Sequence, residues 1–454
     1  MSGRARAAVG FAVVAASLLT VGLGQSWAVS LAVLNLCLIS AVMALGVNIQ
    51  WGYAGLFNVG TMAFAALGGL AAVLVSQPPV PAALAAGGAK LLLATAITCL
   101  TLGLVWVACR GLPRGRLRAF GVTAVAVTGY FATRTFFDPA VKAIEAVNPA
   151  ASGYLGGLGL PIILSWAVGG LFAAGAAYVI GRIALGLRAD YFAIATLGIS
   201  EIVIAVLKNE DWLARGVKNV TGLDRPVPYE IDLQRAAWFQ ELVRSLNVGT
   251  LSALPEAEHA AMLRELVIEA AGIFVKLCYA GLFTLVLLVI LLLSERALRS
   301  PWGRMMRAIR DNETAAEALG KDVFHRHMQV FVIGSAVVGV AGAMLVTLDG
   351  QFTPNSYNPL RFTFLIWVMV IIGGSGNNLG AVLGGFIVWL SWIEAEPLSL
   401  WVIEVLTSAM TPDDPVRMHL VEAAAHVRQI LMGLILLLVM RFSPRGVVPE
   451  TVRY

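Results

Sequence analysis

The sequence predicts an all-α polytopic membrane protein with about 10–12 transmembrane helices. Hydrophobic residues make up 59% of the 454 residues, and the mean hydropathy is +0.82. Charged residues make up only 13%, whereas a soluble domain carries about 25%. Apolar segments near the ~20-residue length that crosses a bilayer recur along the chain. The net charge of +5 comes from arginine clusters in short loops beside these segments, which fits membrane orientation better than nucleic-acid binding.

Twelve apolar segments, taken in order, account for most of the chain. Their approximate bounds are 9–29, 31–49, 60–76, 89–109, 119–137, 163–181, 190–208, 270–294, 328–348, 361–375, 379–395 and 429–442. The first could mimic a signal peptide. It has no convincing cleavage site and another span follows at once, so we expect a retained helix. The segment 119–137 contains Arg134 within its apolar run.

The basic residues predict the orientation, because loops rich in lysine and arginine stay in the cytoplasm. With twelve spans, the arginine clusters all fall on one side. They are Arg4 and Arg6, then Arg110, Arg114, Arg116 and Arg118, then Arg182 and Arg188, then the loop 295–327, then Arg441 and Arg445. That side is expected to be the cytoplasmic side of a multi-pass membrane protein. The segment 209–269 is then an extracytoplasmic insert, and 396–428 is a second polar external segment.

The loop 295–327 is the most informative polar stretch. Ser300 can cap a helix, and Pro301 suits the first helical position. Apolar residues then recur at helical spacing, while arginines form a ridge on another face. The apolar residues are Trp302, Met306 and Ile309; the ridge is Arg304, Arg307 and Arg310, with Gly303 among them.

A second short helix is predicted directly after Asn312, which can cap it. Glu313 lies in its first turn, and the helix stops at Gly320. Its small-residue face is expected to present Ala315, Ala316 and Leu319 as an apolar knob. A simple connector needs only a few residues, so two capped helices indicate a docking surface for a soluble partner. The alternative is a positively charged membrane anchor without a partner.

Polar residues inside the spans are candidates for a transport pathway. They are Asn48, Asn58, Thr196, Ser200 and Glu201. An ionisable group such as Glu201 at that depth is a functional candidate, and we expect it to face the protein interior rather than lipid. The alternative for the asparagines is interhelical hydrogen bonding. The alternative for Glu201 is a structural carboxylate satisfied by a neighbouring helix.

No motif for catalysis, cofactor binding or metal binding stands out. The glycines at 373, 374 and 376 suggest a tight turn between two spans, since no GK[ST] phosphate-loop sequence occurs in the chain. The four cysteines lack metal-like spacing and are interpreted as packing residues. His419 and His426 are interpreted as surface residues. We therefore expect no enzyme activity in this chain.

Four blocks of sequence resemble the LivM-type permeases of branched-chain amino-acid ABC importers. They are GYAGLFNVGTMAFAALG (52–68), LGLRADYFAIATLGISEIV (185–203), SPWGRMMRAIRDNETAAEALG (300–320) and VIIGGSGNNLGAVLGGFIV (370–388), in the family's order. The third block together with the fourth is the part of the resemblance most specific to this family. The resemblance implies an ABC importer permease fold in which 295–327 is the ATPase-coupling loop. Its carried-over residues are Gly303, Arg304, Arg307, Arg310, Glu313, Ala316 and Gly320.

The sequence departs from the family pattern at several places. Asn58 and Thr61 replace the usual Ser and His, and the family's Thr-Gly-Gly segment is reduced to the residues 221–223. The region 80–160 is longer than the family core needs. These departures bear on the substrate rather than on the coupling role.

The resemblance implies an import subunit that conducts branched-chain or related amino acids by alternating access. It implies a second related permease, two ATP-binding subunits that use ATP, and a periplasmic substrate-binding protein as partners. No cofactor is expected in this chain. The alternatives are an ABC permease for urea or amides, and a self-sufficient secondary transporter or channel for a small polar solute.

Overall fold

The computed structural model describes residues 3–111, 113, 115–149, 152–252, 255, 258–408, 410–411 and 414–450. It confirms the all-α prediction, since this part is helical apart from loops and one pair of two-residue strands. The principal helices are α1 (Gly3–Gly24), α2 (Trp27–Val47), α3 (Thr61–Ser76), α5 (Ala89–Gly111), α6 (Arg116–Glu145), α7 (Leu164–Ala184), α8 (Ala189–Asn209), α13 (His259–Arg299), α16 (Val323–Asp349), α17 (Pro359–Gly373), α18 (Asn378–Leu406) and α20 (Val427–Phe442).

Short elements connect these helices. They are η1 (Asn48–Gly52), α4 (Pro81–Ala83), η2 (Leu84–Gly88), α9 (Asp211–Ala214), η3 (Gly216–Lys218), β1 (Val220–Thr221), α10 (Glu230–Arg235), α11 (Ala237–Leu246), α12 (Val248–Ser252), α14 (Pro301–Asp311), α15 (Glu313–Ala318), β2 (Gln351–Phe352), η4 (Pro354–Ser356), α19 (Pro415–Ala423) and η5 (Ala424–His426). The η1 element is a π-helix that continues α2 directly. Asn48, the first of the predicted pathway residues, therefore lies where the helical pitch changes.

Each of the twelve predicted spans overlaps a helix, but the first, 9–29, crosses the break between α1 and α2 at Gln25 and Ser26. Within the described residues, nine helical segments are long and apolar enough to cross a membrane, and α3 and α17 are shorter apolar helices. The predicted span 119–137 is helical within α6 but is not among the nine. Its Arg134 forms an ion pair with Asp138 one turn later, at 3.0 Å.

Several helices are longer than predicted, and two of them extend into the predicted polar segments 209–269 and 396–428. No proline interrupts residues 259–299, so α13 is continuous and absorbs the end of the 209–269 segment. The helix α18 runs through Pro397 to Leu406, so part of the predicted polar segment 396–428 continues a span.

The centre of the bundle is built on α2 and α16, the most buried of the long apolar helices. The helix α16 packs on α7, α3 and α2, while α2 also packs on α13 and α18. Glycine allows this close approach: a Cβ at Gly68 of α3 would overlap the backbone of Gly339 in α16, and one at Gly342 would overlap Ala65.

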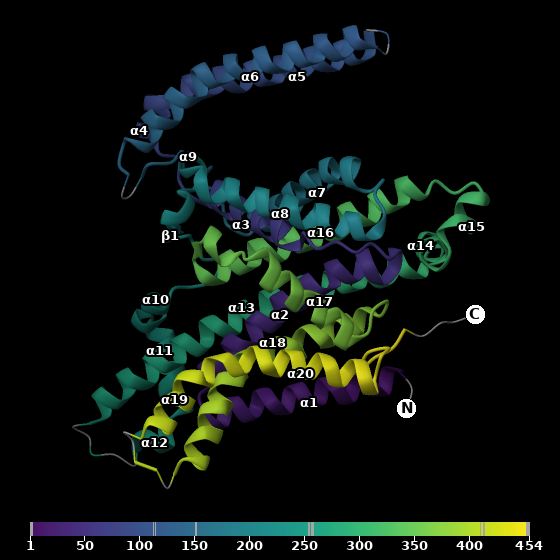
Figure 1. Cartoon of the computed structure of the whole chain (residues 1–454). Helices are drawn as coiled ribbons and strands as arrows, with labels where there is room; N and C mark the ends of the chain where they lie inside the picture. The colour runs from purple at the N-terminus through teal and green to yellow at the C-terminus, as the bar shows by residue number, and fades with distance from the viewer. Residues whose placement is uncertain are drawn as a thin grey trace.

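The two ends of the bundle differ. Both chain termini, α14 and α15 lie at one end, whereas β1, α10, α11, α12 and α19 lie toward the other (Figure 1). We call these the α14–α15 end and the β1–β2 end. At the β1–β2 end, Val220 pairs with Phe352 and Thr221 with Gln351 in an antiparallel ladder. This ladder joins the long segment after α8 to the end of α16.

The helices α5 and α6 form a hairpin that stands away from the bundle (Figure 1). They pack mainly on each other, and α6 also contacts η2, α4 and α9. Large apolar side chains such as Leu92, Leu117 and Phe120 are exposed on it. The hairpin falls within the region 80–160.

Candidate functional site

The loop between α13 and α16 forms two short helices, as predicted. Pro301 occupies the first turn of α14, and Met306 and Ile309 are buried beneath it. Asn312 caps α15, with its Oδ1 accepting a hydrogen bond from the Ala315 N–H at 2.9 Å. Gly320 then adopts a φ of +77°, the left-handed conformation that favours glycine and ends the helix.

Ser300 occupies the N-cap position of α14, as predicted, but its side chain makes no capping hydrogen bond. The Ser300 hydroxyl instead donates to the Ala297 carbonyl at 2.6 Å, which satisfies the end of α13 rather than the start of α14. The turn between the two helices is tight, because a Cβ at Gly303 would overlap the backbone of Leu298. Arg307 reinforces the turn by donating to the Leu298 carbonyl at 3.3 Å.

The predicted apolar knob on α15 is only partly exposed. Leu319 is 80% exposed and Ala315 is also exposed, but Ala316 is 6% exposed. The prediction that all three share one exposed face is therefore wrong for Ala316. Glu313 is exposed beside them.

The predicted arginine ridge is also only partly exposed. Arg304 is exposed and its guanidinium lies 3.4 Å from the Arg299 carbonyl. Arg310 is turned inward: it donates to the Gly52 carbonyl of η1 and pairs with Glu450 at 3.0 Å and Asp311 at 3.2 Å. Its side chain is 24% exposed. Arg310 therefore connects α14 to the core and to the C-terminal segment.

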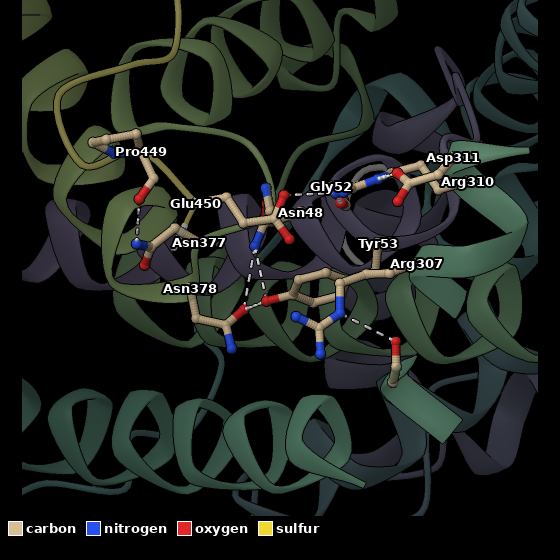
Figure 2. A network of polar contacts seen from close by, with 12 residues as sticks. Asn48, Gly52, Tyr53, Arg307, Arg310, Asp311, Asn377, Asn378, Pro449 and Glu450 are labelled. Atoms are coloured by element: carbon tan, nitrogen blue, oxygen red, sulfur yellow. Dashed lines mark hydrogen bonds and ion pairs between the residues drawn. The ribbon is translucent and has the colours of Figure 1, made fainter. Parts of the chain in front are cut away.

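A polar network lies beside this arginine (Figure 2). Asn48 donates to the Asn378 Oδ1 at 3.2 Å and accepts from the Gly376 N–H at 2.9 Å. The Tyr53 hydroxyl donates to the same Asn378 oxygen, and the Asn378 amide donates to Glu295 at 3.1 Å. The network joins η1, the end of α13 and the turn between α17 and α18.

The C-terminal segment closes over this turn. The Asn377 amide donates to the Pro449 carbonyl at 3.2 Å, and the Val447 and Val448 N–H groups donate to the Ile372 and Gly373 carbonyls at 2.8 and 3.0 Å. The Asn377 side chain also accepts from the Gly380 N–H, which caps α18. Residues from four distant parts of the sequence thus meet under α14.

The predicted pathway residues Asn58, Thr196 and Ser200 meet at a second buried cluster. Asn58 donates to Gln50 at 2.9 Å, and its carbonyl accepts from the Trp367 indole at 3.0 Å. Thr196 and Ser200 of α8 accept from the Val59 and Ala63 N–H groups, each at 3.1 Å. These bonds support the non-helical segment before α3 and its first turn.

In this conformation the asparagine, threonine and serine side chains therefore act as interhelical hydrogen-bonding groups. For Asn48 and Asn58, the sequence left interhelical hydrogen bonding open as the alternative to a role in the pathway. Sequence reasoning missed Gln50, which joins Asn58 to Ser335 of α16 at 2.9 Å. A signal existed: Gln50 is a polar residue two positions after Asn48 in an otherwise apolar run.

Glu201 does not face the interior, so that prediction is wrong. It is exposed on α8, and within the described chain it has no hydrogen bond or ion pair. The reason is helical rotation: Thr196 and Ser200 point toward α3, and the next residue is turned by about 100° to the outer face. A carboxylate thus lies on the surface of an apolar helix, eight residues from its end at Asn209.

The comparisons with known proteins agree with this architecture. The profile of the family described as branched-chain amino acid transport system / permease component matches residues 29–440. The chain is 24% identical over 409 residues, 90% of both chains, to a probable branched-chain amino acid transport permease protein LivM of Methanocaldococcus jannaschii. It is 29% identical over 249 residues, 55% of this chain, to the high-affinity permease LivM of Escherichia coli K12, covering 54% of that protein.

A shorter match concerns a sugar permease. The xylose transport system permease protein XylH of Escherichia coli K12 is 34% identical over 116 residues, 24% of this chain and 30% of that protein. No solved structure matches. The family match covers most of the chain, and the apolar helices make it a multi-pass membrane protein. This chain belongs to the family of branched-chain amino acid transport system permease components.

Proposed function

We propose that this chain is the permease subunit of an ATP-binding-cassette importer that moves branched-chain or related amino acids into the cytoplasm. The observation that carries the proposal is the α14–α15 pair. It offers an exposed Leu319 to a partner, while Arg310 of the same loop contacts η1 and Glu450 beside the polar network. A loop of this kind can both bind a soluble motor and pass its movement to the spans.

The proposal includes the partners that the family resemblance implies. Two ATP-binding subunits supply ATP hydrolysis, a second related permease completes the membrane part, and a periplasmic binding protein delivers substrate to the β1–β2 end. This chain itself carries no cofactor. Transport proceeds by alternating access, and the ATPases bind the two states of the loop unequally, since a ligand without differential affinity shifts no equilibrium.

The decisive experiment reconstitutes the complete set of subunits in proteoliposomes and measures ATP-dependent uptake of labelled leucine. Uptake that requires both ATP and the ATPase chains supports the importer. Uptake by this chain without ATPases would instead support a secondary transporter or channel. Competition by urea or amides tests the related permease specificities.

The orientation can be tested with single cysteines in a background lacking the four native ones. We expect the α14–α15 loop to be cytoplasmic and the segment 209–269 to be periplasmic, because the arginine-rich loops share one side. A membrane-impermeant maleimide added to intact spheroplasts should label cysteine at position 231 or 242, where the native side chains are exposed. It should spare cysteine at position 319. Labelling of position 319 without permeabilisation would contradict the orientation and with it the importer.

Glu201 supports an interface between two permease chains. A charged side chain facing hydrocarbon costs roughly 2.5–3.5 kcal/mol, and nothing in the described chain pairs with this carboxylate. We infer that the second permease covers this face of α8 and that Glu201 lines the pathway between the two chains. The small residues Gly198 and Ala205, also exposed on α8, allow close helix approach there.

The replacement Glu201→Gln tests this role. Because the side chain contacts nothing within the chain, insertion and thermal stability should be unchanged. Uptake should fall by about tenfold or more, corresponding to roughly 1.4 kcal/mol in the transport barrier. The neighbouring exposed residue provides a control, since Ile202→Val should leave uptake near wild type. Normal kinetics in the glutamine variant would remove Glu201 from the pathway.

A further inference from the structure

A cavity of about 240 Å³ lies between α2, α3, α16, α17 and α18 near the β1–β2 end. Its body is lined by aliphatic side chains, including Ile39, Leu365 and Ile366. Polar residues also line it, among them the exposed Asp349, the last residue of α16, and the buried Tyr357 from the loop before α17. The cavity is separate from the outer face of α8 that carries Glu201.

The polar groups of this cavity have no partners in the described chain. The Trp389 indole nitrogen is buried without a hydrogen bond. The Asp349 carboxylate and the Tyr357 hydroxyl take part in no hydrogen bond or ion pair there. Asp349 is exposed, but buried polar groups in native proteins are nearly always hydrogen-bonded, so the unpaired Trp389 indole and the buried, unpaired Tyr357 hydroxyl need an explanation. A ligand that completes these bonds provides one.

The chemistry of the lining defines that ligand. Asp349 can accept from an ammonium group. Burial, and then the neighbouring Asp349 carboxylate, raise the pKa of Tyr357, so its hydroxyl stays protonated and can donate. The aliphatic body excludes a sugar, whose hydroxyl groups would lose their hydrogen bonds there. A simple aliphatic acid would bring its carboxylate beside Asp349.

We propose that this cavity binds a small branched aliphatic molecule bearing a primary ammonium group, with the ammonium at Asp349 and the aliphatic part among Ile39, Leu365 and Ile366. The identification of this molecule as a branched-chain amino acid rests on the proposed function. The amino acid's carboxylate would then accept from Tyr357. Because five helices form the walls, occupation of the cavity also favours the bundle conformation that keeps them at this spacing.

The experiment measures binding to the purified full chain in nanodiscs of phosphatidylcholine, a lipid that carries no primary amine. Equilibrium dialysis compares isopentylamine, leucine and 4-methylpentanoic acid. We expect saturable binding of the amine and of leucine, and binding of the acid at least about tenfold weaker. Equal binding of acid and amine would overturn the assignment of Asp349 as the ammonium partner.

Two variants locate the site. Leu365→Trp fills the cavity and should reduce binding of both ligands about tenfold or more. Its control is Phe364→Trp, because Phe364 is half exposed on the adjacent face of α17. Asp349→Asn preserves the volume and should weaken amine binding to a similar extent. Wild-type binding in both Leu365→Trp and Asp349→Asn would place the ligand elsewhere and refute the proposal.

A lipid headgroup could supply the same ammonium, so a further arm uses phosphatidylethanolamine nanodiscs and native mass spectrometry. A retained phosphatidylethanolamine molecule that Leu365→Trp expels would overturn the small-molecule assignment. The proposed function fails separately: amine binding without ATP-dependent uptake would refute the importer and leave the cavity site standing. Uptake by the complete transporter with no binding in the cavity would refute the site alone.

Discussion

Leu319→Glu is expected to abolish association of the permease with its ATPase subunits while leaving it folded in the membrane. Leu319 is 80% exposed, so the replacement disturbs no contact within the chain. In a complex, the same position would place a carboxylate in an apolar groove without a partner. Truncation of an interface hot spot costs roughly 2 kcal/mol or more, which corresponds to about a 30-fold weaker complex.

Co-purification of the ATPases with tagged permease measures this effect, and ATP-dependent uptake should be lost with it. Leu319→Met keeps an apolar side chain and should retain both. Ala316 is a poorer probe of docking, because a large side chain at this buried position would clash within the loop itself. If Leu319→Glu binds and transports normally, the loop is a charged anchor and the importer loses its main physical support.

Arg310→Ala is expected to separate docking from transport. The replacement leaves the exposed Leu319 and Ala315 in place, so the ATPases should still bind. It removes the link from α14 to the Gly52 carbonyl and to Glu450. Leaving buried acceptors without a donor costs about 1–3 kcal/mol, and the loop can then move without moving η1.

Uptake should therefore fall about tenfold or more, while ATP hydrolysis by the assembled complex continues. The matched control is Arg304→Ala, on the same helix but exposed, where a surface arginine contributes only about 0–1 kcal/mol. Uptake and hydrolysis falling together in Arg310→Ala, with the ATPases lost, would mean that the arginine maintains the docking surface rather than the coupling.

The local signals in the sequence predicted local structure well. The spacing of Met306 and Ile309 gave the buried face of α14, and Asn312 caps α15 because its side chain reaches an N–H three residues away. Ser300 lies at the N-cap position, but its hydroxyl accepts no hydrogen bond from α14 and donates to the Ala297 carbonyl of the preceding helix. The direction of this side chain depends on how tightly α14 folds back on α13 at Gly303.

The remaining features depend on contacts between distant residues. Arg310 meets Gly52 and Glu450, which lie far from it in the sequence in opposite directions, and no spacing rule identifies such partners. The outward direction of Glu201 depends on the rotation of α8 about its axis. Thr196 and Ser200 set that rotation through hydrogen bonds to the segment 59–63. The cavity could not be predicted either, because its walls come from five helices.

The length of α16 and its contacts at both ends allow it to transmit movement across the bundle. Its 27 residues make a rod about 40 Å long, which begins beside α15 and ends at Asp349, directly before the β1–β2 ladder. If α16 pivots by about 4° at its α15 end, a rod of this length displaces its opposite end by roughly 2–3 Å. Since the ladder attaches the segment after α8 to that end of α16, a tilt of α16 also moves this segment.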